Sequence, residues 1–175
     1  MRNMRRMGFL VCAALLVGVS AASAKLPRDV DEFRERQRTE ATKPDGAVKL
    51  WFEAIYLYSA EGTRDAGRKM LNLAMVDEKW EKNTYFVDRL RTKAHIFRSY
   101  AKGATPDNAY KMDPNEFALS IVTSQADTFR EGAWRVMLQS SGSDKARPVV
   151  LVKGNDGLWK VQTYNDIYGD VQAPK

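Results

Sequence analysis

The chain has 175 residues, with 28 Lys and Arg against 22 Asp and Glu, and a net charge of +6. It contains one cysteine, Cys12, and one histidine, His95, which exclude a disulfide framework and any Cys-based or His-rich metal site. We therefore expect neither a metal ion nor a cofactor. The length suits one globular domain with an ordinary hydrophobic core.

The first 24 residues have the three parts of a secretory signal peptide. Arg2, Arg5 and Arg6 precede an apolar run at residues 8–19, and the small residues 22–24 form a cleavage site. The run is shorter than the ~20 residues that a helix needs to cross a bilayer. We expect cleavage after residue 24, export to the periplasm or the extracellular space, and no stable membrane insertion afterwards.

Export would change the charge balance, because three arginines leave with the signal peptide and the net charge falls from +6 to +3. The densest positive cluster consists of Arg89, Arg91, Lys93 and Arg98. No aromatic side chains for base stacking are interleaved with it on the same helix face. We interpret the cluster as a solvated helix face and expect no nucleic-acid partner.

Residues 25–43 alternate in charge and carry only three large apolar residues, Leu26, Val30 and Phe33. Such a segment buries little apolar surface, which favours a charged, flexible leader. A break at residues 43–46 then opens a single domain, which we place at residues 44–175.

The first helix of that domain is predicted at residues 47–60, with Asp45 as its N-cap. Apolar residues recur on one face at helical spacing: Val48, Trp51, Ile55 and Tyr58. Further apolar residues widen this stripe, and only Lys49 and Glu53 are charged within residues 47–60. A helix this apolar is expected to cross the core.

Two more helices are expected before the chain changes its pattern. Thr63 is a suitable N-cap for a helix that runs to about residue 76, and a third helix is expected at residues 84–101. The buried stripe of the third helix follows helical spacing: Phe86, Leu90, Ala94, Phe97 and Ala101. Gly103 stands directly after this helix, where a glycine commonly ends one.

From residue 104 onward the apolar residues alternate, which is typical of β-strands. Strands are expected at residues 109–112, 116–123, 133–140, 148–153 and 158–164. The last two flank residues 154–157, whose sequence Gly-Asn-Asp-Gly indicates a hairpin loop. Three helices followed by four or five antiparallel strands indicate an α+β fold, with the helices on one face of a curved meander sheet.

This order of elements resembles the NTF2-like superfamily, the cystatin-like α+β cone. The stretch DGLWKV at 156–161 is similar to the final strand of many bacterial NTF2-like domains, and three further stretches are similar to an uncharacterised secreted bacterial branch of unknown function: DGAVKLWF at 45–52, SYAKGATP at 99–106 and SSGSDKARP at 140–148. The resemblance implies a strongly bent sheet with an N-terminal helix in its concave face. It carries over no catalytic residues, because this fold hosts many unrelated functions.

We expect an exported, non-catalytic domain that binds a small apolar ligand or a partner protein through the cone mouth or the sheet face. The binding residues that we predict are aromatic, with one polar anchor: Trp51, Tyr58, Tyr100 and Trp159, with Arg147 as the anchor. Arg147 would hold an acidic group of the ligand or pair with Asp144.

Two alternatives stay open at this point. The first is a small cofactor-free isomerase or dehydratase, in which a buried carboxylate with a raised pKa acts as base beside a tyrosine. Glu53 is its candidate, because it lies on the most apolar helix. The second is an envelope assembly component that works through an exposed sheet edge or face. Whether the chain forms a homodimer is likewise open.

Overall fold

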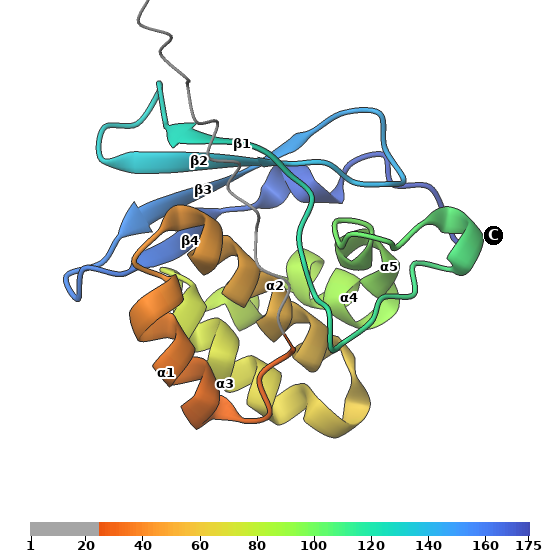
Figure 1. Ribbon diagram of the computed structural model, residues 1–175, viewed down its shortest axis with the longest axis horizontal. Coiled ribbons are helices and arrows are strands. Elements are labelled where there is room, and N and C mark those ends of the chain that lie inside the picture. Colours follow the sequence, from red (N-terminus) through yellow and green to blue (C-terminus); the bar gives the residue numbers. More distant parts are fainter. Residues whose placement is uncertain (1–24) are drawn as a thin grey trace, which may run out of the picture.

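A four-stranded antiparallel sheet forms one layer of the molecule, and the helices pack beneath one of its faces (Figure 1). The computed structural model describes residues 25–175, so the predicted signal peptide lies outside the described part. The strands are β1 (Ile121–Ala126), β2 (Ala133–Leu138), β3 (Arg147–Lys153) and β4 (Trp159–Thr163). The α-helices are α1 (Val30–Glu40), α2 (Pro44–Ser59), α3 (Arg64–Ala74), α4 (Thr84–Thr92) and α5 (Ala94–Arg98). The α+β class predicted from the sequence is thus confirmed.

Neighbouring strands are consecutive in the chain, in the order β1-β2-β3-β4. The loop between β3 and β4 closes with a 2.8 Å hydrogen bond from Gly154 N to Leu158 O, and Gly157 adopts a positive φ of 78°. This is the hairpin expected at residues 154–157. The side chains that face the helices are fully buried: Val136, Leu138, Val149, Leu151 and Val161.

Helix α2 crosses the core, as its apolar composition predicts. Trp51, Phe52 and Ala54 are each fully buried between the sheet and the other helices. The helix begins at Pro44, three residues earlier than expected, because proline suits the first turn, where its missing N–H would have no partner. Asp45 therefore lies inside the helix and is not its N-cap.

The segment expected to be a charged leader contains helix α1, which packs against α2 and α3. Phe33 is fully buried, and Gln37 Nε2 donates a 2.8 Å hydrogen bond to Leu73 O. The Asp29 carboxylate caps the helix by accepting from the N–H groups of Asp31 and Glu32. The expected domain start at residue 44 is therefore wrong, and α1 is part of the domain. One buried stripe and one N-cap are enough to fold this highly charged helix against the others.

The helix expected over residues 84–101 is divided at Lys93, whose φ and ψ of −130° and 40° are not helical. The break yields α4 and α5, so the described residues form five α-helices where the sequence predicted three. Phe86, Leu90 and Phe97 are still buried as expected. The break turns α5 so that it packs on α2 and on the 3₁₀ turn at residues 165–168.

Two expected strands differ in the structure. Residues 109–112 form no strand, because Ala109 and Tyr110 have φ values of 55° and 54°, in the left-handed region. The strand expected at residues 116–123 is shifted to Ile121–Ala126, and Leu119 makes only an isolated bridge with Ala101. The sheet therefore has four strands.

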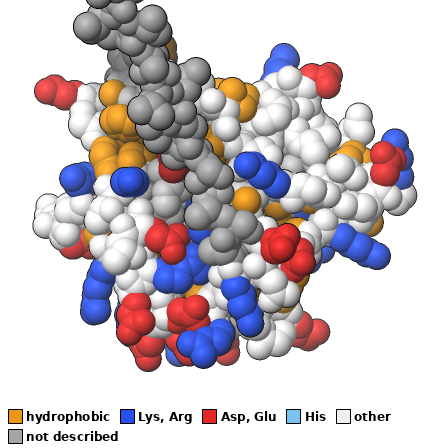
Figure 2. Space-filling model, viewed as in Figure 1, with side chains coloured by type: hydrophobic (Ala, Val, Ile, Leu, Met, Phe, Trp, Pro, Cys, Tyr) orange, Lys and Arg blue, Asp and Glu red, His pale blue; other side chains and the backbone are white. Residues whose placement is uncertain are grey.

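The view in Figure 2 shows charged side chains gathered over α1 and α3, and hydrophobic side chains over the β1–β2 end of the sheet. None of the helices within residues 25–175 combines the length and the apolar character that a membrane span requires.

Candidate functional site

Three of the predicted ligand-binding aromatic residues lie in the packed interior. Trp51 and Tyr100 are fully buried, and Tyr58 is 2% exposed. The Trp51 ring lies 5.1 Å from Phe52 and 5.5 Å from Tyr164, between ring centroids. These aromatic side chains contact one another, so a ligand could reach them only if the core opened.

The hydroxyl of Tyr100 has a structural partner inside the core. Its OH donates a 2.9 Å hydrogen bond to Ile167 O, which ties the interior to the C-terminal segment. Removal from water raises the pKa of Tyr100 well above that of an exposed tyrosine. The hydroxyl therefore stays protonated and acts as a structural donor.

Trp159 is partly exposed at the end of the sheet that lies beside the α1–α2 turn. Its backbone N–H donates to Ala41 O at 2.8 Å, and its ring lies 6.0 Å from that of Trp134. The Lys153 ammonium lies 5.8 Å from the Trp159 ring centroid. Among the four predicted aromatic binding residues, Trp159 is therefore the one that solvent reaches best.

Arg147 lies beside the C-terminal segment and pairs with Asp170, with 2.8 Å between Nη2 and Oδ2. This partner replaces Asp144, which the sequence suggested. The guanidinium also packs on Gly169, where an added Cβ would lie 3.0 Å from Nη2. Arg147 thus braces the C-terminal segment against β3.

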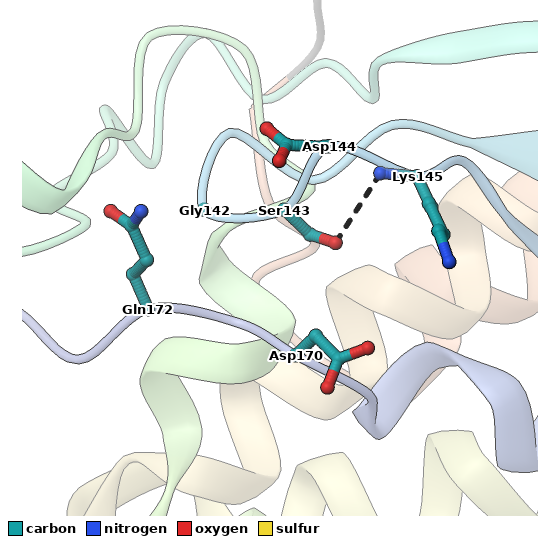
Figure 3. Close-up of a pocket in the computed structure, with 6 residues that line it drawn as sticks. All are labelled: Gly142, Ser143, Asp144, Lys145, Asp170 and Gln172. Carbon is teal, nitrogen blue, oxygen red and sulfur yellow. Dashed lines mark hydrogen bonds between the residues drawn. The ribbon is translucent and has the colours of Figure 1, made fainter.

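A small polar hollow of about 160 Å³ lies next to this brace. Figure 3 shows the loop of residues 142–145 on one side of it and Asp170 and Gln172 on the other. Gln172 N donates to Gly142 O at 2.9 Å, and Tyr110 OH donates to Gln172 O at 2.8 Å. The hollow is lined by glycine and polar or charged residues and is smaller than a typical ligand pocket, so it does not suit an apolar ligand.

Glu53, the candidate general base, is fully buried in a cluster of four charged side chains between α1 and α2. Its Oε1 lies 2.8 Å from Arg36 Nη2 and 3.9 Å from Lys49 Nζ. Glu40 contacts the same two cations, at 2.7 Å and 3.3 Å. Two positive and two negative charges thus compensate one another, which lets the cluster be buried.

Burial raises the pKa of Glu53 to about 7, although Arg36 and Lys49 oppose this rise. Its second oxygen, Oε2, is buried without a hydrogen-bond partner within residues 25–175, and the same holds for Tyr56 OH. The hollow described above is not lined by Glu53 or by any tyrosine. Glu53 thus has the raised pKa of a catalytic acid or base but not a pocket in which a substrate would meet it.

The raised pKa predicts a pH-dependent stability. Between pH 4.5 and 7 the folded state binds a proton that the unfolded state has released, so the free energy of unfolding should fall as pH rises, by about 3 kcal/mol in total. His95 acts in the opposite direction, because burial lowers its pKa. The measurement is urea denaturation from pH 5 to 8 for the wild type and Glu53→Gln. The difference between the two curves isolates Glu53, and a pH-independent difference would contradict the prediction.

Solvent-exposed apolar residues lie at β1 and at the hairpin that follows it. Phe129 is 81% exposed and Val122 is 57% exposed. The Phe129 ring lies 5.1 Å from the Arg135 guanidinium, and its N–H donates to the Asp127 carboxylate at 2.7 Å. We call β1 together with Phe129 the β1 surface. None of the binding residues predicted from the sequence belongs to this surface, although a lone phenylalanine in a charged hairpin loop was a signal for Phe129.

The two edges of the sheet differ. At β4, Val76 N donates to Val161 O at 2.9 Å, and Met75 forms a parallel bridge with Val161, so the chain covers this edge itself. No described strand pairs with the outer edge of β1. Within residues 25–175, the outer edge of β1 is therefore the place where another strand could add to the sheet.

A metal site was not expected from the sequence, and the structure allows the described residues to be searched for one. Within residues 25–175, no three His, Asp or Glu side chains come together in a way that could hold a metal ion.

A family model for a domain of unknown function (DUF6935) matches residues 25–175. The chain belongs to this family. The matched range includes α1, which agrees with the place of this helix inside the domain. Neither the curated proteins nor the solved structures yield a match.

Proposed function

We propose that this chain is an exported, non-catalytic domain that binds a protein partner through the β1 surface. The observation that carries the proposal is the exposure of Phe129 and Val122 beside a sheet edge that no described strand covers. Exposed apolar residues next to backbone groups free to pair are the features that strand-adding partners use. An envelope assembly component would use such a surface.

A small apolar ligand is less well supported than a protein. The aromatic residues that would have lined its pocket, Trp51, Tyr58 and Tyr100, contact other side chains of the core. The hollow beside Arg147 is smaller than a typical ligand pocket. A protein partner needs no cavity, and the β1 surface supplies both apolar side chains and hydrogen-bonding groups.

Two parts of this proposal come from the sequence. Export rests on the signal-peptide pattern of residues 1–24. The NTF2-like relationship rests on the order of helices and strands and on the four stretches quoted above. An α+β domain with its helices on one face of an antiparallel sheet agrees with that relationship at the level of fold class.

The isomerase or dehydratase alternative is favoured only by the buried Glu53 and its raised pKa. A general base must lie within hydrogen-bond reach of the proton it removes. Glu53 instead accepts from Arg36 at 2.8 Å inside a charge-compensated cluster. We therefore assign Glu53 to stability and not to chemistry.

Site-specific photo-crosslinking tests the proposed function. A benzoylphenylalanine in place of Phe129 should give a crosslinked adduct in cells of the native host that produce the full chain. Tyr85 is a matched control, because it is an aromatic residue with 51% exposure on α4, under the opposite side of the sheet. Adducts at position 85 alone, or at neither position, would overturn the proposal.

A further inference from the structure

We infer that the partner at the β1 surface is a second copy of this chain, whose β1 pairs antiparallel with the first across a twofold axis. The inference rests on the proposed function, since it names the partner for the same surface. The result would be one continuous eight-stranded sheet, with β4 of each copy at its outer ends.

The pairing pattern of β1 shows which of its backbone groups are available. Asp127 N donates to Ala133 O at 3.0 Å, and the residues of an antiparallel strand alternate between facing and not facing the neighbouring strand. The backbone N–H and C=O groups of Gln125 and Thr123 therefore point toward β2. Ser124 and Ala126 direct their N–H and C=O groups outward, away from the sheet.

The absence of charged residues in β1 favours pairing with the β1 strand of a second copy. The strand reads IVTSQA and has no charged residue, whereas β2, β3 and β4 each contain Arg or Lys. Edge strands are commonly protected from pairing by lysine or proline, and β1 has neither. In a twofold pair only the residue on the axis faces its own copy, but both strands carry the same net charge, so a charged strand would repel its copy and an uncharged one does not.

The two most exposed large apolar residues within residues 25–175 support the same arrangement. Val122 lies near the start of β1, and Phe129 lies just beyond its end. Antiparallel pairing centred on Ser124 places the start of one strand beside the end of the other. Val122 of each copy then approaches the hairpin that carries Phe129 of the other copy, and both side chains can be removed from water at once.

The register predicts which substitutions disrupt the pair. Ala126→Pro removes an outward N–H that makes no hydrogen bond to β2, and the twofold axis doubles the loss. We expect a dissociation constant about thirtyfold higher. Val122→Lys puts a charge at two related positions where the pair would bury an apolar side chain, and should also weaken it. Val76→Lys is the matched control, because Val76 is 43% exposed and lies beside β4.

The experiment is sedimentation velocity over a concentration series, with the full chain purified as it accumulates in the producing cells. We expect twice the chain mass for the wild type and Val76→Lys, and a shift toward the single-chain mass for Ala126→Pro and Val122→Lys. Thermal unfolding followed by circular dichroism checks that each variant is folded. A single-chain mass at every concentration, or a dimer unaffected by both β1 substitutions, would overturn the inference.

The crosslinking experiment distinguishes this inference from the proposed function. An adduct at position 129 with twice the chain mass supports both. An adduct with a different protein, together with a monomeric purified chain, overturns the second-copy inference and leaves the proposed function standing. Absence of any adduct at position 129, with a monomeric chain in sedimentation, overturns both.

Discussion

Replacing Gly67 by alanine is expected to destabilise the domain by about 3 kcal/mol or more, enough to unfold a marginally stable domain. Gly67 lies where α3 crosses α2, and a Cβ added there would be 2.2 Å from Tyr58 N and 2.7 Å from the carbonyl carbon of Leu57. Both are backbone atoms of a buried helix and cannot rotate away. The two helices would have to separate, which would loosen the packing of Met70 and Leu71.

Gly62→Ala is the control for this prediction. A Cβ at Gly62 meets no atom within 4 Å, so the substitution should change the free energy of unfolding by less than about 1 kcal/mol. Urea denaturation of both variants beside the wild type makes the comparison. If Gly67→Ala unfolds at the same urea concentration as Gly62→Ala, the close approach of α2 and α3 is not as tight as described.

Replacing Arg36 by methionine is expected to cost about 3 kcal/mol, because it leaves Glu53 buried without its nearest cation. The Arg36 side chain is only 16% exposed and contacts Glu40 and Glu53 at once. Lys49 remains 3.9 Å from Glu53, and further protonation of Glu53 would limit the loss. Thermal and urea unfolding at pH 9, where Glu53 with its pKa of about 7 is ionised in the wild type, measure the effect.

Arg34→Met is the matched control, since it removes the same charge from the same helix. Arg34 pairs with Asp31 in solvent, where an ion pair contributes about 0–1 kcal/mol. The double variant Arg36→Met with Glu53→Leu should recover part of the lost stability, because it removes both members of the buried pair. Equal losses for Arg34→Met and Arg36→Met would contradict the role given to the cluster.

Local patterns predicted much of the fold correctly. The apolar face of α2 marked it as the core helix, and alternation from residue 116 onward marked an antiparallel sheet. Glycines at residues 154 and 157 marked the β3–β4 hairpin. These features depend on neighbours within a few residues, so a single sequence contains them.

Residues 25–43 show where local reasoning failed. Their density of charge suggested that they could not fold, yet α1 buries Phe33 and brings Arg36 to Glu53, 17 positions away in the chain. The charges on α1 are acceptable because a distant helix supplies partners for them. No periodicity within the segment carries that information.

For the candidate site, too, the sequence predicted residue types but not their surroundings. The sequence picked out Trp51, Tyr58 and Tyr100 as aromatic and Glu53 as a carboxylate on an apolar helix, but it could not tell a pocket lining from a packed core. The one sign of Phe129 in the sequence was its place in a charged loop, and its exposure could not be predicted because exposure depends on which elements cover a loop.

By itself, the sequence determined that helices precede an antiparallel sheet, the α+β class and the core position of α2, because each follows from spacing along the chain. Only the tertiary structure decided that α1 joins the domain, that Glu53 is neutralised by Arg36, and that β4 is covered while the outer edge of β1 is not. These outcomes depend on contacts between residues far apart in the chain, whose energies no local pattern encodes.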